Sequence, residues 1–555
     1  MPSKWWGWGE PERTYNLKNR PYFWPYLRQK LDFPQEPFLF PPDWREIPLP
    51  PPAFSESAKR KLGAILRADQ IDDSAPTRLA HVYGKSYHDL IRIRTRQFPE
   101  FPDAVVFPED EQQILRLLRW AQEENTAVVP WGGGTSVVGG VEARIGKGQN
   151  SLVVLKLQRM SRLVGIDKIS LIAEAEAGIL GPNLETALQA QGVTLSHYPE
   201  SFEYSTLGGW AATRSAGQQS TLYGKIEKMV ESLRLVTPNG VLETPPFPAA
   251  AVGPDLNQMV LGSEGILGII SRVRVRVKPI PPEKWYTAFL FHSFSAGLEA
   301  VRAILQQGFT PATMRLSDPE ETDFIFALRE KKSGAVSQGF EKLGFGILKK
   351  KGFLPGKRSL LILGLEGTEK SVRLERRAVS EIVKKSKAFS LGKNTGNAWC
   401  RHRFENPYLR DILLDYDLLV DTLETAAEWQ NVGAVYESGR RGIETALKQL
   451  GIPGLVTVHA SHVYPDGTSL YFIILAVPHV GKELEEWWTI KKSASDAIVQ
   501  AGGVISHHHG IGLDHRPWLE KNIGKEGVGL LRQLKQQVDP AGILNPGKLL
   551  PEPGD

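Results

Sequence analysis

The sequence predicts an α+β fold built from two domains. A glycine-rich loop follows a short apolar strand at residues 126–129, and strand and helix patterns alternate from about residue 100 to 282. Prolines at 279, 281 and 282 then interrupt the chain, and longer helical patterns follow. With 555 residues the chain can bury two cores around a crevice, so an enzyme is the expected class.

Four segments are expected along the chain. Residues 1–99 hold aromatic and proline-rich sequence with helices, and residues 100–282 form the first domain. Residues 283–500 form a second, mixed α/β domain, and residues 501–555 hold a histidine-rich loop and a closing segment. The second domain is expected to cap the first.

The elements of the first domain can be read in chain order. A strand is expected at 103–107 and a helix at Glu109–Glu124, whose apolar residues recur on one face. After the strand that leads into the loop, further strands are expected at 152–157, 171–177 and 273–277. A helix is expected at Gly181–Gln191, ending at Gly192.

The second domain mixes longer helices with strands. Helices are expected at 408–430, 438–450 and 481–500, and strands at 359–366 and 469–477. One more helix is expected at 526–538, before the closing sequence of residues 539–548. This mixture indicates a second domain.

The composition excludes several functional classes. The net charge of +5 is spread along the chain without a lysine or arginine block, so a nucleic-acid partner is not expected. No run approaches the roughly 18 apolar residues of a membrane span. A single cysteine, Cys400, and the absence of a secretory signal pattern predict a cytoplasmic location.

Aromatic residues crowd the start of the chain, at 5–8 and 22–26, and a proline-rich connector follows at 41–52. These aromatic side chains are expected to pack against the main body. The alternative is a surface that touches lipid or a long-chain substrate, which would give the protein a peripheral membrane contact.

The glycine-rich loop, residues 130–140, reads Pro-Trp-Gly-Gly-Gly-Thr-Ser-Val-Val-Gly-Gly. Glycines let successive backbone N–H groups converge on one anion, and Thr135 and Ser136 add hydroxyl donors, so the loop is interpreted as a phosphate cradle. It lacks the Gly-Lys-Ser/Thr ending of a Walker loop and the acidic ribose ligand of a Rossmann fingerprint. A glycine-rich hairpin turn is the alternative.

Four more segments rich in glycine or hydroxyl residues follow, at 199–209, 213–217, 222–224 and 262–268. In this order, they resemble the flavoproteins of the vanillyl-alcohol-oxidase type, whose FAD lies extended across an α+β domain. The resemblance implies a PCMH-type FAD-binding domain over 100–282, a cap domain that binds substrate, and a C-terminal segment that returns to the FAD domain.

The same resemblance implies the residues that bind FAD. They are Pro130, Trp131, Gly132, Gly133, Gly134, Thr135 and Ser136 at the pyrophosphate; Glu200, Ser201, Ser205, Thr206, Thr213, Arg214, Ser215 and Ala216 along the flavin; and Glu264, Gly265, Ile266, Leu267, Gly268, Ile269 and Ile270 toward the isoalloxazine or the adenine. Many relatives attach FAD through a histidine of the loop. None stands between Pro130 and Gly140, which predicts a non-covalent flavin.

Three consecutive histidines, His507, His508 and His509, form the strongest candidate for the chemistry, because histidine titrates near neutral pH. A structural loop or a metal-binding tract is the alternative. In flavin-dependent 2-hydroxy-acid dehydrogenases a similar Glu-His-Gly segment joins a His-x-Gly-Asp-Gly-Asn-x-His element to hold a divalent metal. Here His508 and Tyr471 replace two of those ligands, so no metal is expected.

With His508 and Tyr471 at these two positions, the sequence resembles the alkyldihydroxyacetone-phosphate synthases, and this resemblance covers nearly the whole chain. The shared motifs are Trp-x-Gly-Trp-Gly at 5–9, Ser-His-Tyr-Pro at 196–199, Arg-Leu-x-Asp at 315–318, Tyr-x-Arg-Asp at 408–411, Tyr-Phe at 471–472 and Ser-His-His-His-Gly at 506–510. Residues 399–404 depart from the family pattern, which leaves the substrate open.

The resemblance implies roles for individual side chains. Arg410 is expected to bind the substrate phosphate through its planar fork, with Arg315 as a second candidate; a solvated helix arginine is the alternative for Arg410. Tyr471 would be the base only if neighbouring positive charge, from His508 or His509, lowered its pKa from ~10. An aromatic residue of the strand is the alternative for Tyr471. His197 either lines the pocket or is a buried structural histidine.

The implied reaction exchanges the acyl group of acyl-dihydroxyacetone phosphate for a long-chain alcohol, which forms an ether-lipid precursor without net redox change. An FAD-dependent dehydrogenase of 2-hydroxy acids is the alternative, and a flavin-binding scaffold without catalytic activity that associates with membrane is a third. Relatives suggest a homodimer.

Overall fold

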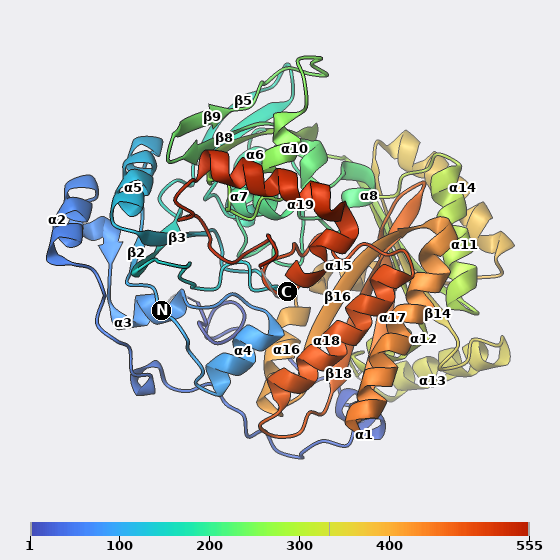
Figure 1. Cartoon of the computed structure of the whole chain (residues 1–555). Helices are drawn as coiled ribbons and strands as arrows, with labels where there is room; N and C mark the ends of the chain where they lie inside the picture. The colour runs from blue at the N-terminus through green and yellow to red at the C-terminus, as the bar shows by residue number, and fades with distance from the viewer. Residues whose placement is uncertain (1–2, 332–333, 553–555) are drawn as a thin grey trace.

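The computed structural model describes residues 3–331 and 334–552, so the remaining positions of the expected terminal and cap segments lie outside the described residues. Figure 1 shows the first domain in blue to green beside the second domain in yellow to orange. The C-terminal helix α19 (Leu519–Val538), in red, lies across the first domain. The last segment of the chain thus returns to the domain that starts near residue 100.

Two sheets form the first domain. The first sheet has the strand order β1-β2-β4-β3, and its last three strands run parallel to one another. The second sheet is antiparallel and has the order β5-β6-β10-β8-β9. The strands are β1 (Ile71–Asp72), β2 (Ala104–Val106), β3 (Thr126–Trp131), β4 (Ser151–Lys156), β5 (Leu163–Asp167), β6 (Ile172–Glu176), β8 (Val230–Thr237), β9 (Gly240–Glu243) and β10 (Ile269–Arg276), with a small ribbon of β7 (Val193–Thr194) and β11 (Lys278–Pro279). One apolar core joins the two sheets.

Helix α5 (Glu111–Glu123) illustrates how the sequence forms this domain. The Asp110 carboxylate caps the helix by accepting the Gln113 N–H at 2.7 Å, and Ile114, Leu117 and Leu118 are fully buried on one face. The other helices here are α6 (Gly181–Gln189), α7 (Leu207–Thr213), α8 (Ser220–Tyr223), α9 (Ile226–Met229) and α10 (Leu256–Val260).

A seven-stranded sheet forms the second domain, in the order β15-β12-β14-β13-β17-β18-β16. Its strands are β12 (Glu283–Phe291), β13 (Thr313–Ser317), β14 (Ser359–Gly367), β15 (Phe389–Gly392), β16 (Leu419–Glu428), β17 (Gly454–Val463) and β18 (Gly467–Ala476). Its helices are α11 (Phe294–Gln306), α12 (Pro319–Ala327), α13 (Ala335–Lys350), α14 (Glu369–Lys385), α15 (Lys393–His402), α16 (Asn406–Asp415), α17 (Trp429–Leu450) and α18 (Glu483–Gln500).

The side chains of strand β18 alternate between the two faces of this sheet, and this alternation shows on which face Tyr471 lies. Leu470, Phe472 and Ile474 alternate along the strand and are buried in the core beneath α17 and α18. Because successive side chains point to opposite faces, Tyr471 points to the face that is not covered by these helices. The candidate chemistry is therefore on the sheet face opposite α17 and α18.

The helix expected at 408–430 is wrong. Helix α16 ends at Asp415, Asp417 adopts a left-handed φ of 58°, and β16 begins at Leu419. All ten residues of β16 pair with β18. The pattern of apolar residues suited a helix, but pairing with a strand some 50 residues away along the chain overrides local preference.

The N-terminal aromatic residues pack against the body of the protein. Trp5 and Trp8 are 8% and 4% exposed, and the backbone N–H of Trp8 donates to the Asp411 carboxylate of α16 at 2.6 Å. The helices of this segment are α1 (Phe23–Lys30), α2 (Glu56–Ile65), α3 (Ala75–Ala80) and α4 (Tyr87–Arg94). These buried tryptophans are not available for lipid contact.

The C-terminal segment is anchored to the first domain by polar contacts. Asn545 donates to the carbonyl oxygens of Gly140 and Glu264, and the buried Asp539 carboxylate accepts the N–H groups of Ile543 and Leu544. Lys535 pairs with Asp539 at 2.5 Å. These contacts hold the end of the chain against the glycine-rich loop.

Replacing Asp539 by alanine is expected to lower the free energy of unfolding by roughly 3 kcal/mol, because Lys535 loses its ion pair and two buried N–H groups lose their acceptor. Urea unfolding followed by circular dichroism measures the change. The matched control is Asp110→Ala, which removes an exposed helix cap and should cost only about 1 kcal/mol. Equal losses in the two variants would contradict the assigned role of Asp539.

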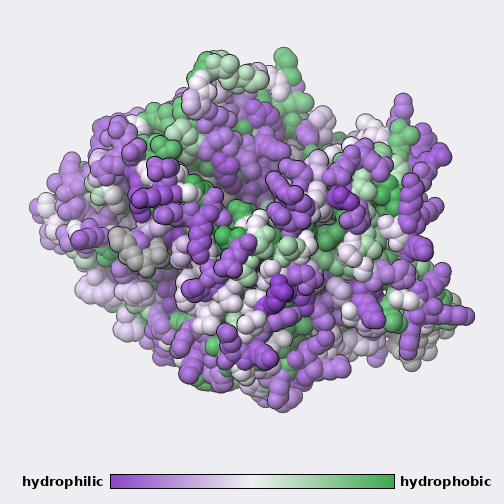
Figure 2. Space-filling model, turned by 45° about the vertical axis from the view of Figure 1, so that its right-hand side comes forward, coloured by the Kyte–Doolittle hydropathy of each residue, from purple (hydrophilic) through white to green (hydrophobic). Residues whose placement is uncertain are grey.

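The face of the molecule in Figure 2 is mostly hydrophilic, with apolar patches scattered over it. Among the described residues, no helix combines the length and the apolar character that crossing a bilayer requires.

Candidate active site

The glycine-rich loop lies directly against the segment 204–206. A Cβ atom on Gly133 would lie 1.7 Å from the Tyr204 carbonyl oxygen, and one on Gly132 would lie 2.4 Å from Thr206 Oγ1. Gly134 adopts a φ of 68°, which favours glycine. The loop needs these glycines to reach the conformation that exposes its backbone to the groove.

Two cavities, of about 260 Å³ and about 100 Å³, open on either side of this contact. Many residues predicted to bind the cofactor line them. In the larger cavity these are Gly132, Gly133, Thr135 and Thr206, and in the smaller one Pro130, Trp131, Gly132, Ser136, Thr206, Thr213, Glu264, Gly265, Gly268, Ile269 and Ile270. His509 of the histidine turn also lines the smaller cavity. The groove thus joins the predicted cofactor loop to the candidate chemistry.

Other residues predicted to bind the cofactor make hydrogen bonds within the first domain or are buried in its core. Ser205 accepts the Trp210 indole N–H, Arg214 donates to the Leu261 carbonyl, and Ile266 and Leu267 are buried in the core. Ser201 accepts two backbone N–H groups through its carbonyl oxygen. Gly134, Ala216 and these residues do not line either of the two cavities.

Glu264 ties the histidine turn to the first domain. Its carboxylate accepts the N–H groups of Ile511 and Gly512 at 2.6 and 2.7 Å, and burial raises its pKa to about 7. Gly510 follows the three histidines with a φ of 89°, and a Cβ atom there would lie 3.0 Å from Glu264 Oε1. A predicted cofactor residue therefore positions the turn as well as lining the groove.

One row of side chains crosses four strands of the cap sheet. Ser317 of β13 pairs with His459 of β17, His459 pairs with Tyr471 of β18, and Tyr471 pairs with Glu424 of β16. Directly paired residues of antiparallel strands share a face. Sheet register thus brings together residues that are more than 150 positions apart in the sequence.

Arg315 belongs to a charged cluster on this face. Its guanidinium pairs with Glu321 at 2.7 Å, and His459 Nδ1 lies 2.9 Å from the same carboxylate. Although burial alone would raise the pKa of Glu321, Arg315 and His459 hold it at about 2. The His459 ring stacks on Tyr471 with centroids 4.9 Å apart. Arg315 is thus already neutralised by a carboxylate, which leaves it weakly suited to bind a phosphate.

The environment of Tyr471 bears on the role expected for it, which stays a prediction. Burial raises the pKa of Tyr471 instead of lowering it, and burial lowers the pKa of His509, 5.3 Å from the Tyr471 ring centre, to about 3. The neutral His509 imidazole therefore does not supply the positive charge that a Tyr471 phenolate would need. Tyr471 is therefore placed to act as a neutral hydrogen-bond donor.

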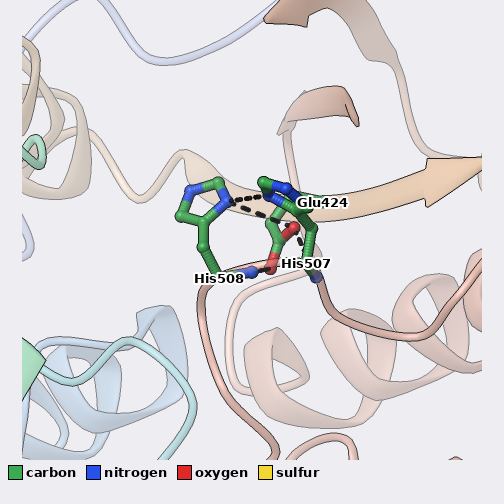
Figure 3. Close-up of side chains that lie close together, drawn as sticks. All are labelled: Glu424, His507 and His508. Carbon is green, nitrogen blue, oxygen red and sulfur yellow. Dashed lines mark hydrogen bonds and ion pairs between the residues drawn. The ribbon is translucent and has the colours of Figure 1, made fainter. Parts of the chain in front are cut away.

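The histidine turn lies against a buried carboxylate, Glu424, and Figure 3 shows this carboxylate beside His507 and His508. Glu424 accepts the backbone N–H groups of all three histidines at 2.7 to 2.9 Å, and the Ser506 hydroxyl at 2.7 Å. Burial would raise the pKa of Glu424, but its contacts with His508 bring it well below the usual value. His507 Nε2 lies 2.7 Å from the Tyr464 hydroxyl.

Glu424, His507 and His508 also bring three potential metal ligands within 4.8 Å of one another, as do His88, Asp89 and Glu142. In the first group the carboxylate already accepts four hydrogen bonds, about as many as its lone pairs allow. In the second group Arg92 pairs with both carboxylates, which occupies the place of a cation. Neither arrangement suits a metal ion.

Arg410 lies on α16 with a side chain that is only 14% exposed. It donates one hydrogen bond, to the Lys85 carbonyl at 2.7 Å, and its Nε and Nη2 atoms are buried without a hydrogen-bond partner in the described part of the chain. Asp411 lies 3.7 Å from Nη2. Arg410 is also close enough to Tyr471 for the two groups to interact electrostatically. A buried fork of this kind is suited to a bidentate anion.

His197 lies in the first domain and is 1% exposed. It shares a hydrogen bond with Ser215 at 2.7 Å and packs against Trp210, and burial lowers its pKa to about 3. The structure thus favours the buried structural role that the sequence left open.

Sequence reasoning missed Glu424, His459 and Glu321. Glu424 and His459 lie in strands whose apolar pattern dominates, and strand pairing places them beside Tyr471. Glu321 lies on helix α12, and its contacts with Arg315 and His459 bring it to the same cluster. The one usable signal was a charged or polar residue in a mostly buried strand, such as Glu424 in β16.

Comparison with known proteins shows which protein families this chain is similar to. Residues 102–244 match the model of a FAD binding domain, and residues 280–549 match the C-terminal domain of FAD linked oxidases. An alkyldihydroxyacetonephosphate synthase of Dictyostelium discoideum is 36% identical over 95% of this chain and 87% of its own length. The corresponding protein of Trypanosoma brucei brucei is also 36% identical, over 91% of this chain and 82% of its own length.

The chain belongs to the alkyldihydroxyacetonephosphate synthase family. A solved structure of an alkyldihydroxyacetonephosphate synthase superposes with a TM-score of 0.84 at 32% identity, covering 98% of this chain and 97% of the other. The two-domain flavoprotein fold expected from the sequence is confirmed, and so is FAD as the cofactor of this family member. The non-covalent attachment of FAD stays a prediction.

Proposed function

We propose that this family member exchanges the acyl group of acyl-dihydroxyacetone phosphate for a long-chain alcohol. In this reaction the bond between the substrate carbon and the ester oxygen breaks, the fatty acid leaves, and the alcohol oxygen forms the new ether bond. When bound, FAD supplies the reversible electron-donating and electron-accepting chemistry that allows exchange without net oxidation. The chain's own residues bind the phosphate and manage protons.

The observation that carries this proposal is the buried guanidinium of Arg410, which has two nitrogen atoms without hydrogen-bond partners in the described residues and lies near Tyr471. Buried guanidinium N–H groups without hydrogen-bond acceptors are costly, and phosphate oxygens would accept from them. A scaffold without a phosphorylated ligand would have no use for this arrangement.

The test is incubation of the FAD-loaded protein with acyl-dihydroxyacetone phosphate and labelled hexadecanol. Labelled ether product supports the proposal. Flavin bleaching by D-2-hydroxy acids in the absence of air, without ether formation, would instead indicate the dehydrogenase. If neither reaction occurs while FAD binding persists, the scaffold is favoured.

Within this reaction, Glu200 has the properties of a base. It accepts hydrogen bonds from Gln218 at 2.8 Å and Asn406 at 3.2 Å, between the two domains, and burial raises its pKa to about 7. It interacts electrostatically with Arg315 and Tyr471. A carboxylate tuned to neutral pH can accept the substrate proton while the Tyr471 phenol donates a hydrogen bond.

The value of kcat/KM is expected to rise with pH through about 7, because Glu200 must lose its proton before it can act as a base. Glu200→Gln should lower the rate and abolish this rise. Glu203→Gln, in the same segment, is the matched control and should keep it. The assignment fails if Glu200→Gln keeps the wild-type pH profile.

We propose helix α13 as a site of peripheral membrane contact, because apolar side chains are exposed on it. Leu343 and Ile347 are 60% and 42% exposed, and Lys349 and Lys350 follow in the last turn. We also propose a cytoplasmic location and a homodimer, as expected from the sequence and its relatives. Vesicle flotation and light scattering test the membrane contact and the dimer.

A further inference from the structure

The contacts of Glu424 bear on which nitrogen of His508 carries a hydrogen. A chain of short contacts runs from the Tyr464 hydroxyl to His507 Nε2 at 2.7 Å and from His507 Nδ1 to His508 Nδ1 at 3.0 Å. His508 Nδ1 also lies 3.4 Å from Glu424 Oε2. For the two facing Nδ1 atoms to form a hydrogen bond, one must donate and the other accept.

Glu424 determines the direction of that bond. Its side chain is 0% exposed, and no lysine or arginine of the described residues forms an ion pair with it. A lone pair on His508 Nδ1 would face this carboxylate and be repelled, whereas an N–H there is attracted. His508 is therefore the donor, and His507 Nδ1 is the acceptor.

The rest of the chain follows from this direction. His507 accepts at Nδ1, so as a neutral imidazole it carries its hydrogen on Nε2 and donates to the Tyr464 oxygen. The second nitrogen of His508, Nε2, points away from Glu424 (Figure 3). The His508 ring lies near Tyr471, with ring centroids 6.1 Å apart. Within the described part of the chain His508 Nε2 makes no hydrogen bond, so this nitrogen remains for chemistry.

We infer that Glu424 is a positioning residue that holds the histidine turn by its backbone and fixes His508 with a hydrogen on Nδ1. This resembles the way a carboxylate behind a ligating or catalytic histidine orients the ring and selects its tautomer. The tautomer itself does not depend on the proposed function. Only the use of Nε2 in the reaction rests on it.

The tautomer can be read by nitrogen NMR of the FAD-loaded protein labelled at its 12 histidines. The signals of His508 are assigned by their loss in His508→Gln. In the wild type we expect the pattern of an Nδ1–H imidazole. A wild-type His508 without hydrogen on Nδ1 would overturn the inference, and this measurement needs no Glu424 variant.

Glu424→Gln removes the charge at nearly constant size. We expect His508 to shift toward the Nε2–H form and kcat for ether formation to fall about 10- to 100-fold, with KM for acyl-dihydroxyacetone phosphate little changed. The matched control is Ser506→Ala, which removes one donor to the same carboxylate but keeps the charge, and should keep the wild-type tautomer. An unchanged tautomer in folded, FAD-containing Glu424→Gln also overturns the inference. A wild type that makes no ether but shows the Nδ1–H form refutes only the proposed function.

Discussion

Tyr471→Phe is expected to lower kcat for ether formation by about 10²- to 10⁴-fold, with the bound FAD unchanged. The substitution removes only the phenolic hydroxyl. The ring can still stack on His459, and strand β18 keeps its pairing with β17. Burial keeps Tyr471 neutral, so the hydroxyl acts by donating a hydrogen bond. The labelled-alcohol assay measures the rate, and the flavin absorbance reports cofactor content.

The control for this variant is Tyr416→Phe, which removes a hydroxyl from an aromatic cluster with the N-terminal segment and should leave turnover unchanged. Full activity in Tyr471→Phe would exclude the hydroxyl from the chemistry. Loss of FAD in the same variant would indicate a structural role instead.

Arg410→Lys is expected to lower kcat/KM for acyl-dihydroxyacetone phosphate by about 100-fold, while FAD stays bound. A lysine keeps the charge but cannot present two parallel donors to one phosphate. Losing a charge-assisted hydrogen bond costs about 1.5 to 3 kcal/mol, and 1.4 kcal/mol corresponds to tenfold. Steady-state kinetics with varied substrate measure the change.

Arg377→Lys is the control for this effect, because the Arg377 side chain is 84% exposed on α14 and pairs only with Glu381 among the described residues. A dephosphorylated substrate analogue sharpens the test. If wild type and Arg410→Lys use that analogue equally well, the arginine acts on the phosphate; an equal loss with both substrates would assign Arg410 to the fold.

Local patterns predicted much of the first domain because its signals lie within short windows. The apolar stripe of α5 and the glycines after β3 each depend on neighbours only a few residues away. The same was true of α18 and β14 in the second domain. Residues 408–430 failed because the strand there is stabilised by β18.

The candidate site was only partly predictable for the same reason. His507–His509, Tyr471 and Arg410 stood out by residue type and by resemblance, but nothing in the sequence showed that a carboxylate on β16 lies beneath the histidine turn. Nor could the sequence show whether charge near Tyr471 would lower its pKa. That depends on the burial of groups brought together from three segments.

The sequence alone determined the fold class, the cofactor loop and the residue types available for chemistry, because each follows from local spacing or from motifs within single segments. Tertiary structure decided which of these side chains share a charge, a hydrogen bond or a cavity. Electrostatic energy depends on distance and on exclusion of water, and both are properties of the folded chain, not of positions along it.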